Sequence, residues 1–78
     1  MEILDVTKSH TKETLIQMIN KSVDDNQWSN KETAHVLQTS LADISLIKRL
    51  NTANFSLDRL LIFLVRLDYK VTISISIN

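Results

Sequence analysis

Glycine, proline and cysteine are all absent from this chain of 78 residues. Without cysteine it has no disulfide and no thiolate metal site, so the sequence leaves the redox compartment open. Without glycine it has no glycine-rich phosphate-binding loop. We therefore expect every turn to use Asn, Asp, Gln, Ser or Thr, of which Asn and Asp tolerate the left-handed region best.

Net charge and long apolar runs are missing as well. Nine basic and nine acidic residues cancel, which argues against strong non-specific affinity for nucleic acid but leaves room for DNA binding by one charged face. The longest apolar run, Leu60 to Val65, is too short to cross a membrane. The first ten residues lack the apolar stretch of a signal peptide. We expect a cytoplasmic protein without membrane contact.

The chain has the length of one small domain. A core of this size provides only a few kcal/mol of stability, and small chains often depend on a disulfide, a metal or a second subunit. We divide the chain into an N-terminal arm or short strand (1–10), a helical domain (11–68) and a C-terminal β-strand (69–78). Helical spacing and caps predict helices from Thr11 to about Asp25, Ser29 to about Gln38, Ser40 to about Leu50 and Ser56 to about Leu67.

The second and third predicted helices form a pair with a tight turn. Ser29 and Glu32 have the S-x-x-E spacing of a capping box, and Thr39-Ser40 offers a hydroxyl cap for the next helix. Ala34 and Leu37 share one face of the first helix, and Ile44 and Ile47 share the inner face of the second. Two short helices joined in this way make a helix-turn-helix.

These residues resemble the helix-turn-helix of the XRE (Cro/C1-repressor-like) family, and most closely its small antitoxin-type branch with a terminal strand. The resemblance covers roughly residues 12–77 and includes the block Phe55-Ser56-Leu57-Asp58-Arg59-Leu60-Leu61. The chain departs from the family at three positions. Gln38 replaces the usual turn glycine, Leu41 replaces a usual glutamine, and Asp43 stands where a basic or polar residue is common.

The resemblance implies a mainly α, four-helix, lambda-repressor-like domain with a C-terminal β-strand used in dimerisation. It also implies that the second helix of the motif enters the major groove of double-stranded DNA. Transferred by position, the candidate DNA-binding residues are Asn30, Lys31, Thr39, Ser40, Leu41, Ala42, Asp43, Ser45, Lys48 and Arg49. Serine and threonine can bond base edges, but Asp43 should repel the phosphate backbone.

Two apolar segments predict a homodimer. The helix from Ser56 to Leu67 carries Leu57, Leu60, Leu61 and Leu64 inward and is apolar nearly all round, as is typical of a helix buried on two faces. In the tail, alternation predicts a strand that needs a partner, either Ile3 to Val6 or a second chain. We favour the second chain, with a candidate interface of Ile62, Phe63, Val65, Val71, Ile73, Ile75 and Ile77.

No catalytic group is evident, and we expect neither an enzyme nor a cofactor. His10 and His35 are isolated, and His35 with Glu32 is too few ligands for a metal. Trp28 is expected to be a core or boundary residue. The sequence thus predicts a DNA-binding transcription regulator of the antitoxin type that binds a short palindromic operator. The alternative is a protein-interaction module, a toxin-neutralising or scaffold protein, which Leu41 and Leu46 on the outer side of the third helix would suit.

Overall fold

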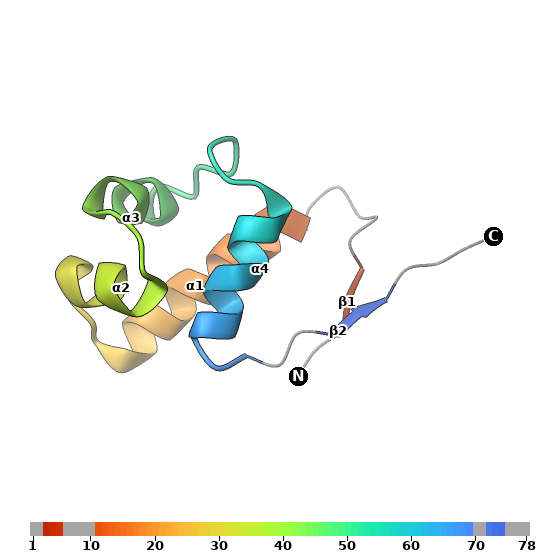
Figure 1. Cartoon of the computed structure of the whole chain (residues 1–78), viewed down its shortest axis with the longest axis horizontal. Helices are drawn as coiled ribbons and strands as arrows, with labels where there is room; N and C mark the ends of the chain where they lie inside the picture. Colours follow the sequence, from red (N-terminus) through yellow and green to blue (C-terminus); the bar gives the residue numbers. More distant parts are fainter. Residues whose placement is uncertain (1–2, 6–10, 70–71, 75–78) are drawn as a thin grey trace.

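The computed structural model describes residues 3–5, 11–69 and 72–74. Four helices follow a short strand and precede another (Figure 1). In chain order the elements are β1 (Ile3–Asp5), α1 (Thr11–Asn26), α2 (Asn30–Leu37), α3 (Leu41–Lys48), α4 (Leu57–Arg66) and β2 (Thr72–Ser74). The prediction of a mainly α chain with four helices is confirmed, with each helix end within about two residues of its predicted position.

Serine side chains begin three of the helices. Ser29 and Glu32 form the predicted capping box, in which Ser29 Oγ accepts from the Glu32 N–H at 3.1 Å and Glu32 Oε1 accepts from the Ser29 N–H at 3.4 Å. Ser40 Oγ accepts from the Asp43 N–H, and Ser56 Oγ accepts from the Arg59 N–H. Each cap satisfies a backbone donor that the helix itself leaves unpaired.

The four helices also end alike, although no glycine is available. The residue after each helix, or one further on, has positive φ: Gln27 (56°), Gln38 (56°), Leu50 (59°) and Asp68 (66°). The next N–H then donates to the carbonyl five residues back, as from Thr39 to Ala34 at 3.0 Å, which is the Schellman pattern. One expectation was wrong in detail: Leu50, a residue outside the expected set, takes one turn position.

The core lies between α1, α4 and the α2–α3 pair. It is made of aliphatic residues and two aromatic rings that meet edge to face: Leu15, Ile16, Ile19, Ala34, Leu37, Ile44, Ile47, Phe55, Leu60, Phe63 and Leu64. The inner stripe of α4 is therefore Leu60, Phe63 and Leu64, while Leu57 and Leu61 are only partly buried. Phe63, which we expected in the dimer interface, therefore lies in the core of its own chain.

The two strands pair in parallel, with Ile3 opposite Thr72, Leu4 opposite Ile73 and Asp5 opposite Ser74. The partners considered for the tail strand were the segment from Ile3 to Val6 and a second chain. In the described residues the tail strand pairs with the segment of its own chain. The strands lie beside the helical body, on the side opposite α2 and α3 (Figure 1). Tyr69, expected to start the strand, is instead held at the end of α4, where its N–H donates to the Leu64 carbonyl and its hydroxyl bonds the Ser22 hydroxyl at 3.0 Å. Val71, Ile75 and Ile77 lie outside the described residues.

Candidate nucleic-acid interface

The α2–α3 pair has the form of a helix-turn-helix. α2 ends at Leu37, α3 begins at Leu41, and the left-handed Gln38 makes the turn between them. The departure from the usual glycine is therefore accommodated by a glutamine in the glycine-like conformation. Because left-handed backbone costs a residue with a Cβ roughly 1 kcal/mol, packing on both sides must hold this turn.

The outward face of α3 is small, polar and weakly basic. Buried Ile44 and Ile47 define its inner side. Its other sides carry the exposed Leu41, Ala42, Lys48 and Arg49 and the half-buried Ser45. Leu41 is 58% exposed. Ser40 caps the start of this face, and the Arg49 guanidinium donates to Ser45 Oγ at 3.3 Å. Such a face offers hydroxyls, two methyl-bearing side chains and two cations to a ligand.

Asp43 and Thr39 do not belong to this outward face. The Asp43 carboxylate accepts a hydrogen bond from the Thr39 hydroxyl and forms an ion pair with the Arg59 guanidinium of α4 at 2.8 Å. The Thr39 hydroxyl bond and then the Arg59 bond hold the pKa of the Asp43 carboxyl below its usual value. The charge that we expected to repel DNA is thus turned toward α4 and paired within the chain.

The sequence analysis did not identify Arg59 as a residue that contacts the start of α3. Its guanidinium carbon lies 5.2 Å from the Phe55 ring centroid and 5.4 Å from that of Phe63, which is within the range of a cation–π contact. The guanidinium thus contacts the two rings, while Asp43 Oδ2 and Thr39 Oγ1 accept hydrogen bonds from its NH2 group. The sequence held a signal for this ion pair, namely the arginine of the FSLDRLL block and an acid on α3. Arg59 and Asp43 are sixteen positions apart, however, and their contact depends on how α4 is placed relative to α3.

A second α4 arginine holds the other side of the turn. Arg66 NH1 donates to the Leu37 carbonyl at 2.9 Å, which satisfies one of the carbonyls left open at the end of α2. Arg59 and Arg66 are two helical turns apart and so lie on one side of α4. Together they fix the end of α2 and the start of α3, where the left-handed Gln38 would otherwise be strained.

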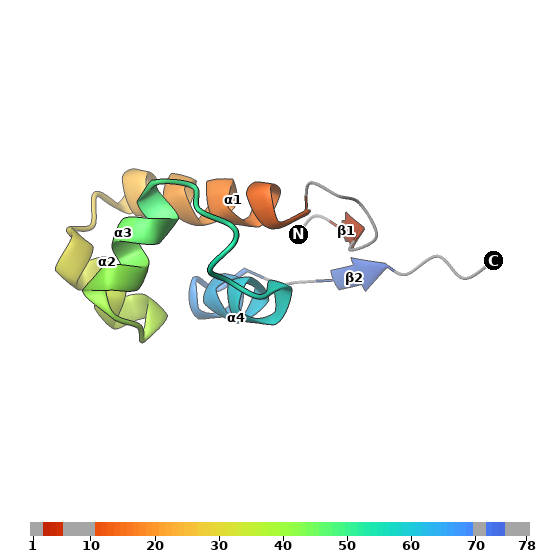
Figure 2. The same cartoon turned by 90° about the horizontal axis from the view of Figure 1, so that it is seen from above.

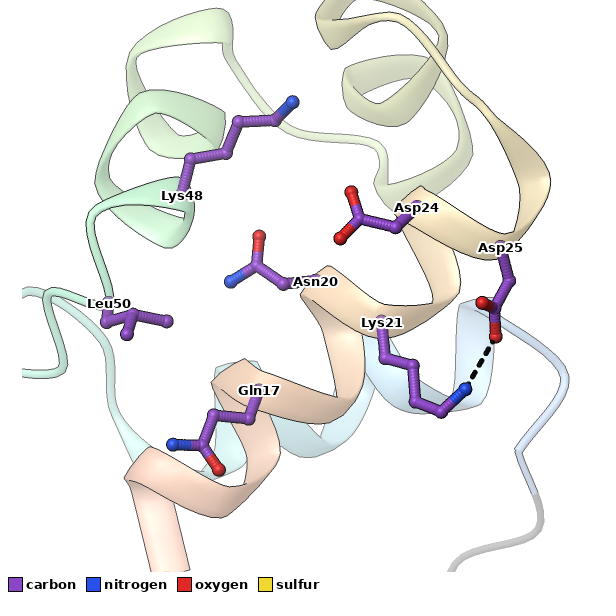
Figure 3. Close-up of a pocket in the computed structure, with 7 residues that line it drawn as sticks. All are labelled: Gln17, Asn20, Lys21, Asp24, Asp25, Lys48 and Leu50. Carbon is purple, nitrogen blue, oxygen red and sulfur yellow. Dashed lines mark hydrogen bonds and ion pairs between the residues drawn. The ribbon is translucent and has the colours of Figure 1, made fainter.

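The end of α3 is fixed against α1. Asn20 donates from Nδ2 to the Ile47 carbonyl at 2.9 Å and to the Ile16 carbonyl at 3.2 Å. Lys48 lines a shallow pocket with Leu50 and with a row of α1 side chains that includes Asp24 and the ion-paired Lys21 and Asp25 (Figure 3). The Asp25 bond and charge raise the pKa of Lys21. The Lys48 side chain itself is exposed at the edge of this pocket.

Asn30 and Lys31, the candidates from α2, are exposed in its first turn. Trp28 precedes them and is half-buried, as expected for a boundary residue. It lines a second shallow pocket with Lys31, Glu32, His35 and Val36. Both polar candidates are therefore free to contact a ligand that lies across the start of α2.

The dimer candidates fall into two groups. Ile62 (47% exposed) and Val65 (58% exposed) are open on α4, whereas Phe63 is 2% exposed and is thus unavailable to a partner. Ile73 is in β2 opposite Leu4. Leu46, expected on the outer side of α3, is partly buried against the core, because the helical repeat places it near the α4 side.

Comparison with known proteins agrees with this geometry. A family model described as a helix-turn-helix domain matches residues 4–76. Comparison with curated proteins and with solved structures gave no match. Among the described residues, no helix combines the length and apolar character needed to span a bilayer.

Proposed function

The chain belongs to the helix-turn-helix domain family, and from this premise we propose that it is a DNA-binding transcription regulator of the antitoxin type. It binds a short palindromic operator as a homodimer, with α3 of each subunit in the major groove. The observation that carries the proposal is the face of α3 at which Leu41, Ala42, Lys48 and Arg49 are exposed among the described residues, and from which the one acid of the helix is turned toward Arg59.

Each group on that face has a matching feature on DNA. The hydroxyls of Ser40 and Ser45 suit base edges, and Leu41 and Ala42 suit the methyl group of thymine. Lys48 and Arg49 at the end of α3 suit phosphates, as do Asn30 and Lys31 at the start of α2. A symmetric dimer then requires the two α3 helices to lie about one DNA turn apart, roughly 34 Å.

The test is fluorescence anisotropy on labelled duplex DNA enriched from a random pool, at low and at physiological salt. If Lys31, Lys48 and Arg49 of both subunits contact phosphates, about six contacts are made, and affinity should fall roughly a thousandfold between 50 and 200 mM salt. One dimer should bind each site. Failure to enrich any sequence, with no binding even at low salt, would refute the proposal.

A matched pair of variants locates the contact. Arg49→Gln removes a cation from the open face of α3 and should reduce the magnitude of the salt slope by about two per dimer. Lys12→Gln removes a cation from the first turn of α1, at the end of that helix farthest from α2, and should leave the slope unchanged. Equal slopes in the two variants would mean that α3 does not face the DNA.

The second candidate is a protein-interaction module that neutralises a toxin or acts as a scaffold. The exposed Leu41 favours it, because an apolar side chain in the middle of a short polar face also suits a protein partner. Salt separates the two candidates, since apolar association changes little over the range in which phosphate contacts are lost.

A further inference from the structure

The outer face of α4 is an apolar surface that no part of the described chain covers. α4 forms the border of the helical body on the side away from α1, and no helix lies beyond it (Figure 2). Ile62 and Val65 are separated by about one turn on that face, and they are two of the four large apolar side chains that are exposed among the described residues. Leu61 flanks them and is partly buried. Apolar groups at helical spacing are suited to a second helix.

The charges on this face are arranged symmetrically about Ile62. Asp58 lies four residues before it and Arg66 four residues after it, so the three form one ridge along the helix. Asp58 is exposed, and no hydrogen bond or ion pair joins its carboxylate to the rest of the described chain. Arg66 uses NH1 for the Leu37 carbonyl, which leaves the donors of NH2 for another acceptor.

We propose that α4 packs antiparallel against α4 of a second copy, about a two-fold axis at Ile62, with Asp58 of each chain paired to the partner's Arg66. An antiparallel arrangement reverses the ridge, so each acid meets a base at both ends of the contact. A parallel arrangement would place acid against acid. The inference rests on the homodimer of the proposed function and assigns its helical contact.

The length of α4 sets the strength of this contact. Ten residues span about 15 Å, and two such helices bury less than the roughly 1,200 Å² of a standard stable interface. The contact must therefore act together with another one. The unpaired edges of the β1–β2 sheet are the neighbouring candidate, since exposed strand edges accept a further strand.

The first test is crosslinking at the axis. The chain has no cysteine, so Ile62→Cys introduces a single thiol. Mild oxidation should convert most of the Ile62→Cys dimer into a covalent dimer, whereas Leu41→Cys, on α3 and at a position at least as exposed, should remain uncrosslinked. A non-covalent dimer that forms no Ile62→Cys crosslink would overturn the α4 contact while leaving the homodimer and DNA binding standing.

The second test uses charge exchange. Asp58→Lys and Arg66→Glu each place like charges opposite one another in their own homodimer, and each should raise the dissociation constant about tenfold. Mixing the two variants restores both pairs, so a heterodimer should form preferentially at a concentration where neither variant dimerises alone. Circular dichroism checks that Arg66→Glu, which loses its bond to Leu37, is still folded.

The outcomes separate the hypotheses. If folded Asp58→Lys dimerises as well as the natural chain, or if the mixture shows no preference for the heterodimer, the antiparallel pairing is wrong. A chain that is monomeric at every concentration by sedimentation overturns both the α4 contact and the homodimer. Its DNA binding is then measured independently by anisotropy, which bears only on the proposed function.

Discussion

The outer faces of α3 and α4 rest on the same core but differ in chemistry. The α3 face carries Ser45, Ala42 and two cations around one leucine, whereas the α4 face carries Ile62 and Val65 with one acid and one base at its ends. The acid of α3, Asp43, is turned inward to Arg59, while the acid of α4, Asp58, is left outward. The position of one carboxylate therefore distinguishes the two faces. With its acid paired inside the chain, the α3 face suits phosphates, and with its acid exposed, the α4 face suits a second copy.

Deletion of Val71–Asn78 tests whether the α4 face is sufficient for dimerisation. It removes β2 and with it the pairing to β1, and because α4 alone buries too little area for a stable interface, we expect the dimer to be lost. Static light scattering measures the mass in solution. A truncated chain that remains dimeric would show that the strand is not needed.

Leu41 and Val65 are matched probes, since both are 58% exposed. Val65→Lys places a charge in the α4 contact and should weaken the dimer at least tenfold. Leu41→Lys should leave the dimer unchanged and strengthen non-specific DNA binding by adding a phosphate contact. Sedimentation velocity measures the dimer, and anisotropy measures DNA binding. If Leu41→Lys weakened the dimer and Val65→Lys strengthened DNA binding instead, the assignment of the two faces would be reversed.

Arg59→Gln breaks the link by which α4 holds α3. It removes the ion pair with Asp43 and the contact with two aromatic rings. The pair is partly exposed, so solvent screening limits the loss in the free energy of unfolding to about 1–2 kcal/mol. Urea denaturation measures it. Lys12→Gln is the control, and equal stability of both variants would mean that the arginine contributes nothing to holding the turn.

The pH dependence of stability should identify Asp43. Its pKa is lower in the folded chain than in the unfolded chain, chiefly through the Thr39 hydroxyl and then Arg59. The stabilisation is therefore present above the unfolded value of about 3.9 and is lost as the pH falls through the folded value. Asp43→Asn should be less stable than the natural chain at neutral pH, with the gap closing in acid. A gap that is independent of pH would exclude this linkage.

Gln38→Gly should give the smallest effect, and in the stabilising direction. Glycine adopts the observed φ of 56° without a clash at Cβ, so we expect a gain of about 0.5–1 kcal/mol. Leu50→Gly, at the equivalent position after α3, should behave similarly. Urea denaturation checks both, and destabilisation by either would mean that the side chain contributes more through packing than it costs in strain.

Local sequence signals predicted the helices well and the open surfaces less well. The caps at Ser29, Ser40 and Ser56 are local bonds over three residues, so their spacing alone identified where helices begin. Phe63 was misplaced because an apolar residue on the nearly all-apolar α4 reveals no direction, and Leu46 was misplaced because its partial burial depends on the neighbouring helices rather than on α3 alone. Only the crossing of α4 over the α2–α3 pair decides which side is covered.

The sequence by itself determined the four helices, their order and the turn between α2 and α3, because caps and helical periodicity act over a few residues. The tertiary structure alone decided that Asp43 faces Arg59, that Arg66 closes the end of α2 and that β1 pairs with β2 in parallel. These contacts join residues sixteen to nearly seventy positions apart. Their formation depends on the angles at which packed helices cross, which no local pattern encodes.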